Sequence, residues 1–549
     1  MRDEVKSRNL QSAICNSFWW LLPALVAFGL ALIFRDPFIG DWDAVDYTVL
    51  AVHGEPSSMA LGRLLFVGYN HALWSLAHFG FGLRVEHAHL LFQFAIIAQV
   101  PLATTACWAL ARAVTDSRRV ATLAALLVGT SPAFVIYGGQ VMTEIPSLLV
   151  ATCAMLIYWR GTRNLRMGQM LAGAALLGVG VNLRETVAFF GLWLLLAPVV
   201  VRRGEGESGR SGETPSGAMS RACSFFLPLS PSPLLPFFLF AVCAFAPFAL
   251  WYGLDVGGYR ASWHGWLVSM QVETARHPVT WHNLWPFAAM AAVAASPVFW
   301  LWPAAMFTEW RRHRFSATFA LGVCGLAATA LLFFNYSTTI NARYFLSGLP
   351  ALAPVVAAFL LSGLTALTGD KRRGFAWALA CVCVVALARD ALIWGQKARL
   401  TPKRLASKNY REKLAQIPPD AVVMAGARTV AVHYWRNLGL GQWETIGTGG
   451  GWPDAQLIPL IQQHLANGRR VFLDTDPHAW AVCGWQMSET RRLPELERYF
   501  RFRAVSLTLP TLYEIRLPDD ATALAQPHLS SLLPENRPAD VHRCFSLTD

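Results

Sequence analysis

The chain has 549 residues, of which 54% are hydrophobic, 12% aromatic and only 15% charged, and its mean hydropathy is +0.37. Soluble domains carry about 25% charged residues, so this composition excludes an ordinary soluble protein. The 46 Lys and Arg exceed the 34 Asp and Glu, for a formal charge of +12. Because the arginines sit in short loops between apolar runs, we interpret this charge as a membrane-topology signal that also meets anionic lipid headgroups. Nucleic-acid binding is not predicted.

The first predicted membrane span covers residues 17–34 and follows three basic residues. Basic residues before a span place its start in the cytoplasm, and no small-residue cleavage site follows, so we expect an uncleaved anchor. The next loop, residues 35–63, is then external. It holds three carboxylates within six residues: Asp41, Asp43 and Asp46. The structural alternative makes Asp41 a helix N-cap and Asp43 a first-turn acid favoured by the helix dipole.

Residues 64–83 are apolar but contain Asn70, His71 and His78. We predict an amphipathic helix along the outer interface, because a crossing here would move every later arginine loop outside. Further spans are predicted at residues 89–111, 120–137, 145–159, 169–181, 186–201, 225–252, 284–307, 315–334, 344–361 and 376–394. With the first span these make about eleven crossings, and every second loop is basic, as the positive-inside rule requires.

The predicted domains are a transmembrane domain over residues 1–395 and a soluble domain over residues 396–549. In the first, residues 202–221 read as a flexible cytoplasmic linker and residues 253–283 as an external loop. In the second, strands are predicted at 421–424 and 470–474, a helix at 457–465, and a strand pair at 507–517. Such alternation indicates a small α/β domain with some parallel sheet. An odd number of crossings makes this domain extracytoplasmic.

The external loops collect charged residues of both signs, and such groups at a bilayer edge are costly unless they are paired or solvated. A converging set is therefore a candidate site. Each member has a structural alternative: Glu144 as a first-turn carboxylate, Arg184 with Glu185 as a local ion pair, and Arg343 with Tyr344 as an interfacial anchor. Further candidates are Arg260 and His264, although His264 reads equally as an exposed loop residue.

Three short motifs stand out: Asp41-Trp42-Asp43, Thr143-Glu144-Ile145-Pro146 and Arg343-Tyr344-Phe345-Leu346. With the layout of the whole chain, they resemble the GT-C class of integral-membrane glycosyltransferases, near the protein-O-mannosyltransferase and aminoarabinose-transferase branch. The resemblance implies a catalytic carboxylate in the first external loop and a sugar donor linked to a lipid phosphate. It implies these roles: Asp43 or Asp41 as the base, Glu144 as a second acidic group, Arg343 and Arg184 with Tyr344 at the donor phosphate, and Asp46, His264 and Arg260 as further contacts.

The same chemistry follows from physical needs. A carboxylate must accept the acceptor's proton, fixed positive charge must stabilise the departing phosphate, and the lipid tail needs an apolar groove. We predict these partners: a polyprenyl-phosphate sugar donor, a glycan, lipid or protein acceptor, and membrane lipids, without nucleic acid. The sequence identifies no definite cofactor; a divalent cation is left open, with Asp41 and Asp43 as its candidate ligands.

Two other classes of protein remain open. A transporter or lipid flippase would need charges in mid-span, broken helices or inverted repeats. A receptor or scaffold would bind through its C-terminal domain and tolerate substitution of the membrane acids. In each case we expect an integral protein of the bacterial inner membrane and cell envelope. The sequence leaves open the sugar, the acceptor, the oligomeric state and which aspartate is the base.

Overall fold

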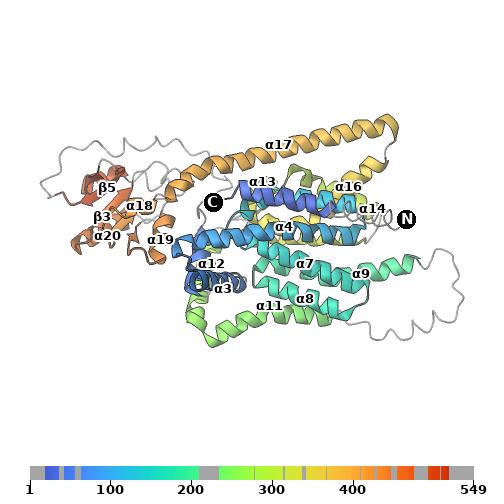
Figure 1. The fold of residues 1–549 in the computed structure, drawn as a ribbon, viewed down its shortest axis with the longest axis horizontal. Helices are drawn as coiled ribbons and strands as arrows, with labels where there is room; N and C mark the ends of the chain where they lie inside the picture. The colour runs from blue at the N-terminus through green and yellow to red at the C-terminus, as the bar shows by residue number, and fades with distance from the viewer. Residues whose placement is uncertain are drawn as a thin grey trace. The chain divides into compact units, whose positions relative to one another are not determined.

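The computed structural model (Figure 1) describes residues 19–35, 42–55, 63–208, 234–276, 279–312, 316–336, 342–366, 368–408, 410–425, 429–446, 454–474, 493–506 and 509–518. The chain forms two compact units. The first comprises Met1–Arg35, His53–Phe81 and Leu90–Gly395, and the second comprises Asp36–Val52, Gly82–His89 and Gln396–Asp549. The main division falls beside the predicted boundary at residue 395, but two early segments belong to the second unit.

The first unit is helical. Its long apolar helices are α4 (Ala88–Thr115), α7 (Glu144–Arg163), α9 (Gly191–Ser208), α11 (Leu234–Leu254), α15 (Ala317–Tyr336), α16 (Leu349–Ala366) and α17 (Gly369–Lys408). Among the described residues, seven helical segments are long and apolar enough to cross a membrane. An eighth is added if α5 (Arg118–Gly129) and α6 (Pro132–Gly138) form one span bent by 63°. Two shorter apolar helices are Trp19–Ile33 and α8 (Met167–Val181). The predicted count of eleven stays a prediction.

Two of the predicted spans are each divided into shorter helices. The span 120–137 bends between α5 and α6. The span 284–307 divides into α13 (Leu284–Ala294), η5 (Pro297–Leu301) and α14 (Trp302–Arg312). Each break has a serine in extended conformation directly before a proline, Ser131 at ψ 141° and Ser296 at ψ 143°. A proline ring disfavours the helical conformation of the residue before it, so the chain turns there. α17, in contrast, continues beyond its predicted end at residue 394.

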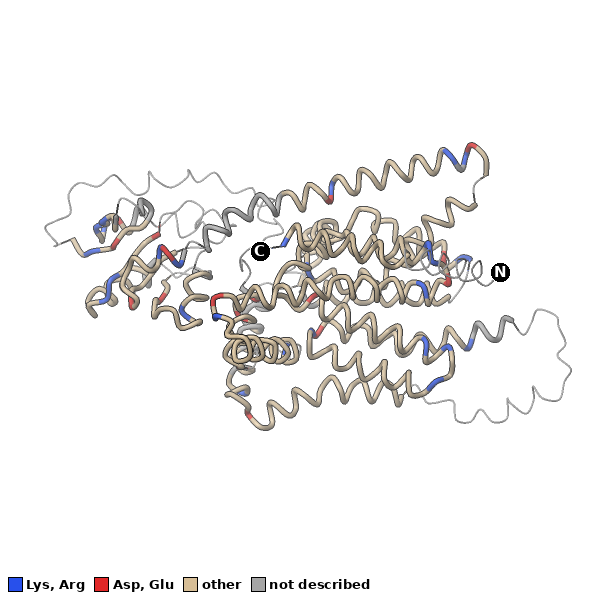
Figure 2. Tube along the Cα trace, in the orientation of Figure 1, with Lys and Arg blue, Asp and Glu red and all other residues tan. Residues whose placement is uncertain are grey.

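Hydrogen bonds and ion pairs show which helix ends lie together. Asp116, after α4, forms an ion pair with Arg163 of α7 at 3.3 Å, and Thr122 of α5 donates to the carbonyl of Trp19 at 2.8 Å. We call this the arginine end, after Arg112, Arg118, Arg160 and Arg163. Figure 2 shows Lys and Arg gathered here, while most helix middles lack charge; α17, with Arg389 and Asp390, is an exception. At the other end Gln93 of α4 donates to the carbonyl of Gly139 at 2.7 Å.

α3 (Leu64–Phe81) fills most of the segment predicted as an interfacial helix. In Figure 1 it is seen nearly end-on, whereas α4 and α7 run across the view, so α3 lies crosswise to them. Its exposed side includes Phe79 and Phe81, each 82% exposed. The N–H of Leu65 donates to the carbonyl of Asn182, just after α8, at 3.2 Å. This arrangement is compatible with an interfacial position, which stays a prediction.

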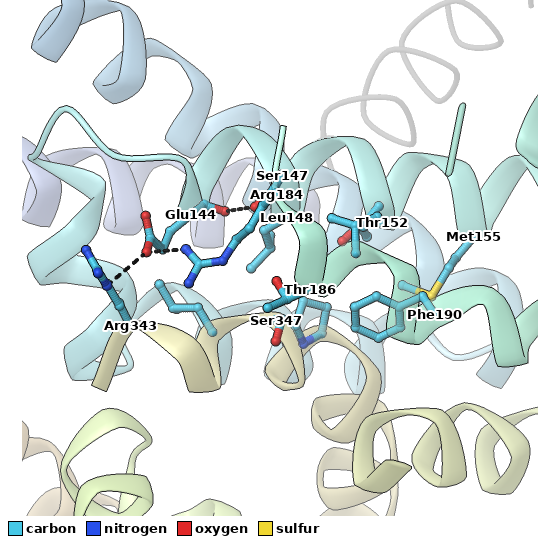
Figure 3. Close-up of a pocket in the computed structure, with 14 residues that line it drawn as sticks. Glu144, Ser147, Leu148, Thr152, Met155, Arg184, Thr186, Phe190, Arg343 and Ser347 are labelled. Carbon is cyan, nitrogen blue, oxygen red and sulfur yellow. Dashed lines mark hydrogen bonds and ion pairs between the residues drawn. The ribbon is translucent and has the colours of Figure 1, made fainter. Parts of the chain in front are cut away.

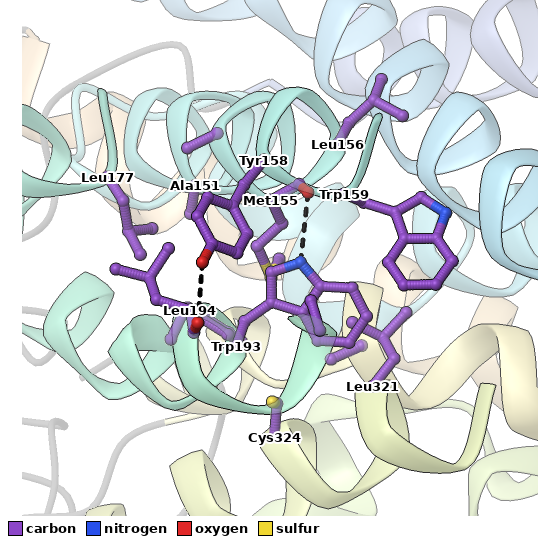
Figure 4. Packing of buried hydrophobic residues seen from close by; sticks show 14 of the residues in the cluster. Ala151, Met155, Leu156, Tyr158, Trp159, Leu177, Trp193, Leu194, Leu321 and Cys324 are labelled. Carbon is purple, nitrogen blue, oxygen red and sulfur yellow. Dashed lines mark hydrogen bonds between the residues drawn. The ribbon is translucent and has the colours of Figure 1, made fainter. Parts of the chain in front are cut away.

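A dense apolar core joins α7, α8 and α9 (Figure 4). Two aromatic side chains of this core satisfy their polar atoms by donating across helices. The Tyr158 hydroxyl donates to the carbonyl of Leu194 at 2.8 Å, and the Trp193 indole donates to the carbonyl of Met155 at 3.1 Å. Such bonds fix the register of α7 against α9 and leave no buried donor unpaired at these rings. The core therefore holds the starts of α7 and of the α9 segment in a defined relation.

α7 and α8 approach closely because a glycine faces α7. A Cβ atom added at Gly173 would lie 2.6 Å from the backbone nitrogen of Tyr158 and 2.9 Å from the carbonyl of Ala154. Small residues at helix contacts in membranes let two backbones pack directly. The remaining elements of this unit are η2 (Glu185–Phe190), η3 (Val256–Gly258), α12 (Tyr259–Arg276), η4 (Trp281–Asn283) and η6 (Ala342–Ser347).

The second unit contains the predicted α/β domain. Its five-stranded sheet has the order β2-β1-β3-β5-β4. The central strand β1 (Val422–Met424) pairs in parallel with β2 (Glu444–Thr445) and β3 (Val471–Asp474). β5 (Leu509–Arg516) runs antiparallel to β3 and to β4 (Arg501–Ser506). The helices here are α2 (Trp42–His53), η1 (Val85–His87), α18 (Tyr410–Leu414), α19 (Thr429–Asn437), α20 (Asp454–Ala466) and α23 (Leu493–Tyr499).

The predictions for this domain were right in kind and wrong in one position. β1, β3 and α20 fall on the predicted strands and helix. The strand pair begins earlier than residue 507, because β4 is already formed at Arg501. Residues 501–504 alternate charged and apolar side chains, Arg501-Phe502-Arg503-Ala504, a strand pattern that the predicted start at 507 missed. The glycine-rich run Gly447-Thr448-Gly449-Gly450-Gly451 lies outside the described residues, as do Cys483 and Cys544.

Candidate functional site

Glu144 is the first residue of α7 and is only 3% exposed. A carboxylate in the first turn is favoured by the helix dipole, which explains its position but not its burial. Its carboxylate forms an ion pair with the guanidinium of Arg184. Its other oxygen, Oε2, has no hydrogen-bond partner in the part of the chain that the structure describes. A buried carboxylate oxygen without a hydrogen bond lowers the stability of the fold. Such a group is therefore a candidate for a functional role.

Arg184 lies between α8 and η2 and is also 3% exposed. Besides Glu144, it donates to the hydroxyl of Thr143 at 3.3 Å. The two ion-pair partners are 40 residues apart in sequence, and the packing of α7 on α8 brings them together. Breaking such a buried pair by removing one member leaves an uncompensated charge in a poorly solvated place. Arg184 therefore has a structural role whatever else it does.

Arg343 reaches the same carboxylate from a third, distant segment. It lies in η6, its side chain is 11% exposed, and its Nε is 3.7 Å from Glu144 Oε1. The Tyr344 ring lies 5.2 Å from the guanidinium carbon of both Arg184 and Arg343. Figure 3 shows Glu144 between the two arginines. Two guanidinium groups thus meet one carboxylate, an arrangement suited to an additional anion.

A cavity extends from this cluster along α7, η2 and η6. Its charged end is formed by Glu144, Arg184 and Arg343, and its other end is apolar, with Met155 and Phe190 (Figure 3). The cavity volume is ≈ 10 Å³, which is about the space that one water molecule needs. In this conformation a sugar phosphate does not fit inside. Substrate entry would require movement of the walls, and Arg343 is the most exposed of the three charged groups.

The aspartates of the first loop belong to the second unit. Asp43 lies in the first turn of α2 and Asp46 one turn later, and both side chains are half-buried. Asp41 lies outside the described residues. Among those described, no group of three or more His, Cys, Asp or Glu is arranged to hold a metal ion. The predicted meeting of these aspartates with Glu144 and Arg343 stays a prediction.

Arg260 and His264 do not line the cavity at Glu144. Arg260 is exposed and donates to the carbonyls of Tyr252 and Gly253, at 2.7 and 2.6 Å. A cation near these last carbonyls of α11 is favoured by the helix dipole, so its visible role is local. His264, on α12, is exposed. The roles predicted for both residues stay predictions.

Sequence reasoning missed the hydroxyl groups around the charged cluster. Thr143, Ser147, Thr186 and Ser347 lie within a few residues of Glu144, Arg184 or Arg343. Three of them line the cavity, and Thr143 receives a hydrogen bond from Arg184. Ser147 instead donates to the backbone carbonyl of Glu144 at 3.0 Å. Hydroxyls are common in apolar helices, so only their nearness to the charges offers a signal.

Residues 73–208 match the model of the family described as dolichyl-phosphate-mannose-protein mannosyltransferase. The matched segment is about a quarter of the chain and includes Glu144 and Arg184. No curated protein sequence matches.

Solved structures show a likeness of layout. The ArnT protein of Cupriavidus metallidurans in the apo state matches with a TM-score of 0.48 and 12% identity, over 91% of this chain and 98% of that one. The Archaeoglobus fulgidus oligosaccharyltransferase in complex with Zn and sulfate matches with a TM-score of 0.46 and 15% identity, over 91% of this chain and 73% of that one. The same archaeal enzyme, AglB, in complex with an inhibitory peptide and a dolichol-phosphate, matches with a TM-score of 0.44 and 14% identity, over 91% and 74%. All these scores fall short of one half, so they carry no argument about function.

The resemblance to the GT-C class of membrane glycosyltransferases is confirmed by the family match over residues 73–208. With the apolar helices described above, it makes the chain an integral membrane protein. The matched family transfers sugar, so the match supports a glycosyltransferase. The particular donor, acceptor and base are a separate question.

Proposed function

We propose that this protein transfers a sugar from a polyprenyl-phosphate donor to an acceptor at the end of the bundle that carries Glu144. The observation that carries the proposal is the buried meeting of Glu144, Arg184 and Arg343, from three distant segments, two of them inside the family match. Fixed guanidinium groups at a membrane edge suit a lipid-linked phosphate better than a neutral ligand.

The reaction requires a carboxylate base and a stabilised leaving group. A carboxylate of the first loop, Asp43 or Asp41, takes the proton of the acceptor hydroxyl as its oxygen bonds to the anomeric carbon. The bond between that carbon and the phosphate oxygen breaks, and polyprenyl phosphate departs with the electron pair. Arg343 stabilises the growing negative charge on the phosphate. Glu144 keeps both arginines oriented while no donor is bound.

The orientation and location belong to the same proposal. The arginine end faces the cytoplasm by the positive-inside rule. The Glu144 end and the α/β domain face the outside, and the membrane is the bacterial inner membrane. A lipid-linked donor fits this side, because soluble nucleotide sugars are scarce outside the cytoplasm. The acceptor is a glycan, a lipid or a protein.

A transporter finds less support. Its expected signature is charge in mid-span, and α17 does carry Arg389 beside the buried Asp390. Arg389, however, donates to the carbonyls of Ala292 and Ala295 at 2.5 and 3.3 Å. These are the last carbonyls of α13, so the pair fastens α17 to a helix terminus.

The decisive experiment is sugar transfer in membranes containing Asp41→Asn, Asp43→Asn or Asp46→Asn. We expect one of the first two to lose activity by a factor of about 10²–10⁴, as for the loss of a general base, with normal protein levels. Asp370→Asn is the matched control, because this carboxylate is fully exposed at the start of α17. Full activity in all three variants would remove the acidic loop from the mechanism.

A further inference from the structure

The arginine end contains a second hollow, separate from the cavity at Glu144. It lies between the C-terminal ends of α4 and α7 and has a volume of ≈ 510 Å³. Glu144 begins α7, whereas Arg160 and Arg163 lie in its last turn. A helix of 20 residues is about 30 Å long, so the two cavities lie at opposite ends of a helix long enough to cross the hydrocarbon layer. Nothing in the proposed transfer reaction uses this second hollow.

Asp116 connects the two walls of the hollow. Its carboxylate forms ion pairs with Arg112 of α4 at 3.4 Å and with Arg163 of α7 at 3.3 Å. Its backbone adopts a left-handed conformation, with φ of 50°, which Asp tolerates better than most residues. This turn ends α4 and directs the chain into α5. Asp116 therefore pairs at an exposed position with one arginine from each wall of the hollow.

Two indole rings also line the hollow. Trp108 donates to the hydroxyl of Thr122 at 3.1 Å, and Trp159 donates to the carbonyl of Ala113 at 3.0 Å. Both indole N–H groups are thus used within the protein, and the rings present apolar surface to the hollow. Tryptophan favours the level of the lipid headgroups, where a polar rim and an apolar wall meet.

The hollow carries excess positive charge. Three arginines line it against the single acid Asp116. Arg112 and Arg163 share that acid, while Arg160 is exposed and has no ion pair in the described part of the chain. Next to the hollow, Leu165 is 75% exposed, as expected for a side chain that faces lipid. Charge at a helix end sets topology without any ligand, but here three arginines and two tryptophans line one open hollow of ≈ 510 Å³, which gives room for a headgroup.

We propose that this hollow binds the phosphodiester headgroup of an anionic phospholipid from the cytoplasmic leaflet. Arg160 and Arg163 hold the phosphate, for which guanidinium geometry is well suited, and the acyl chains lie outside against α4 and α7. Basic pockets between helices on this side of a membrane bind such headgroups. Free phosphate shares the charge but lacks the acyl chains that would cover the apolar surface.

The test is native mass spectrometry of the full-length protein in detergent, titrated with phosphatidylglycerol or phosphatidylcholine. We expect wild-type protein to retain phosphatidylglycerol selectively. Arg160→Gln should lower its apparent affinity roughly fivefold, as for one arginine at a headgroup site, and Arg160→Lys should recover most of it. Arg312→Gln, at an exposed arginine in the last turn of α14, is the matched control and should bind as wild type.

Three results would overturn the proposal. The first is equal retention of phosphatidylcholine, and the second is an equal loss in Arg312→Gln, which would mean a general charge effect. The third is complete displacement of the lipid by millimolar inorganic phosphate, which would assign the hollow to free phosphate. Because Arg160 is exposed and forms no ion pair with the described residues, its variants should keep the wild-type melting temperature in detergent. If the melting temperature of Arg160→Gln falls, Arg160→Lys, which keeps the positive charge, separates a loss of lipid binding from a loss of folding. Sugar transfer is not part of the test, so its outcome is independent of the proposed function.

Discussion

The single carboxylate of Glu144 contacts two guanidinium groups. It neutralises Arg184 in a place almost without solvent, and it lies close to Arg343, the more exposed guanidinium. A buried ion pair contributes little net stability, because desolvation offsets attraction, yet losing one partner is costly. Arg184 is the more deeply buried partner of Glu144, with a side chain 4% exposed, and Arg343, at 11%, is the more accessible one.

This division predicts strong coupling between Glu144 and Arg184. Glu144→Gln should destabilise the protein by about 3–5 kcal/mol, because Arg184 keeps a buried charge without its counterion. The double variant Glu144→Gln with Arg184→Gln should be less destabilised than the sum of the single variants. Thermal unfolding in detergent measures all three. Strictly additive losses would mean that the two side chains do not act as a pair.

Glu514 in the α/β domain makes stability depend on pH. Burial acts to raise its pKa, but hydrogen bonds from Arg470 at 2.6 Å and Arg516 at 2.8 Å outweigh burial. The pKa of Glu514 is thereby held below its ordinary value of 4.5. A carboxyl whose pKa is lower in the folded state stabilises it above pH 4.5, and this contribution disappears as pH falls through the folded-state pKa.

We therefore expect β3 and β5 to lose protection from hydrogen exchange, corrected for intrinsic rates, as pH falls below 4.5. Glu514→Gln should be less protected at neutral pH and should change less on acidification. Identical pH profiles for the variant and wild type would exclude this carboxyl as the source. Glu497, on the neighbouring helix α23, provides a comparison through Glu497→Gln.

The packing of α7 against α8 positions Glu144 next to Arg184. This packing depends on the absence of a side chain at Gly173. An added methyl group there would meet the backbone of α7 at 2.6 Å. Such overpacking costs about 1–3 kcal/mol and would displace Glu144 relative to Arg184. Helix contacts of this kind are rigid, since backbone cannot yield as a flexible side chain can.

Gly173→Ala should thus lower the melting temperature and, through the site, the rate of sugar transfer. Gly168→Ala in the same helix is its control, since nothing lies within 4 Å of the added atom. The control should be neutral or slightly stabilising, because alanine is the better helix former by roughly 0.5–1 kcal/mol. Equal melting temperatures for the two variants would show that the packing at Gly173 adapts freely.

At this scale the sequence predicted the helices well and their interruptions poorly. Apolar runs identify helices because burial or lipid contact demands hydrophobic side chains along the whole length. The bends at Ser131 and Ser296 depend on a proline that follows each serine. A proline inside an apolar run does not always break a helix, and α16 continues through Pro354. Whether the chain turns is decided by packing, which local sequence does not contain.

The candidate site was predictable to a similar extent. Glu144, Arg184 and Arg343 are conspicuous because charge is rare among apolar residues, and the structure brings these three together. The burial of the cluster and the hydroxyls of Thr143 and Thr186 were not predictable, since they follow from how α7 meets η2 and η6. The sequence placed charges at one membrane surface, and the fold determined which of them touch.

At the scale of the whole molecule, the second compact unit combines early and late segments of the chain. α2, with Asp43 and Asp46, belongs to the same compact unit as the α/β domain. The early segment 82–89 is tied to this domain as well. Arg411 forms an ion pair with Glu86, and the Tyr434 hydroxyl lies 3.4 Å from Nδ1 of His89. Residues near the beginning of the chain thus complete a unit that consists mostly of its end.

Because the second unit combines early and late segments, it can be completed only late in synthesis of the chain. A ribosome delivers α2 and the segment 82–89 to the membrane several hundred residues before the strands that share their unit. Until those strands are synthesised, α2 lacks most of the unit to which it belongs. Chains truncated before the strands would keep the ion pairs of Glu144 with Arg184 and Arg343, but α2 would be left without the rest of its unit.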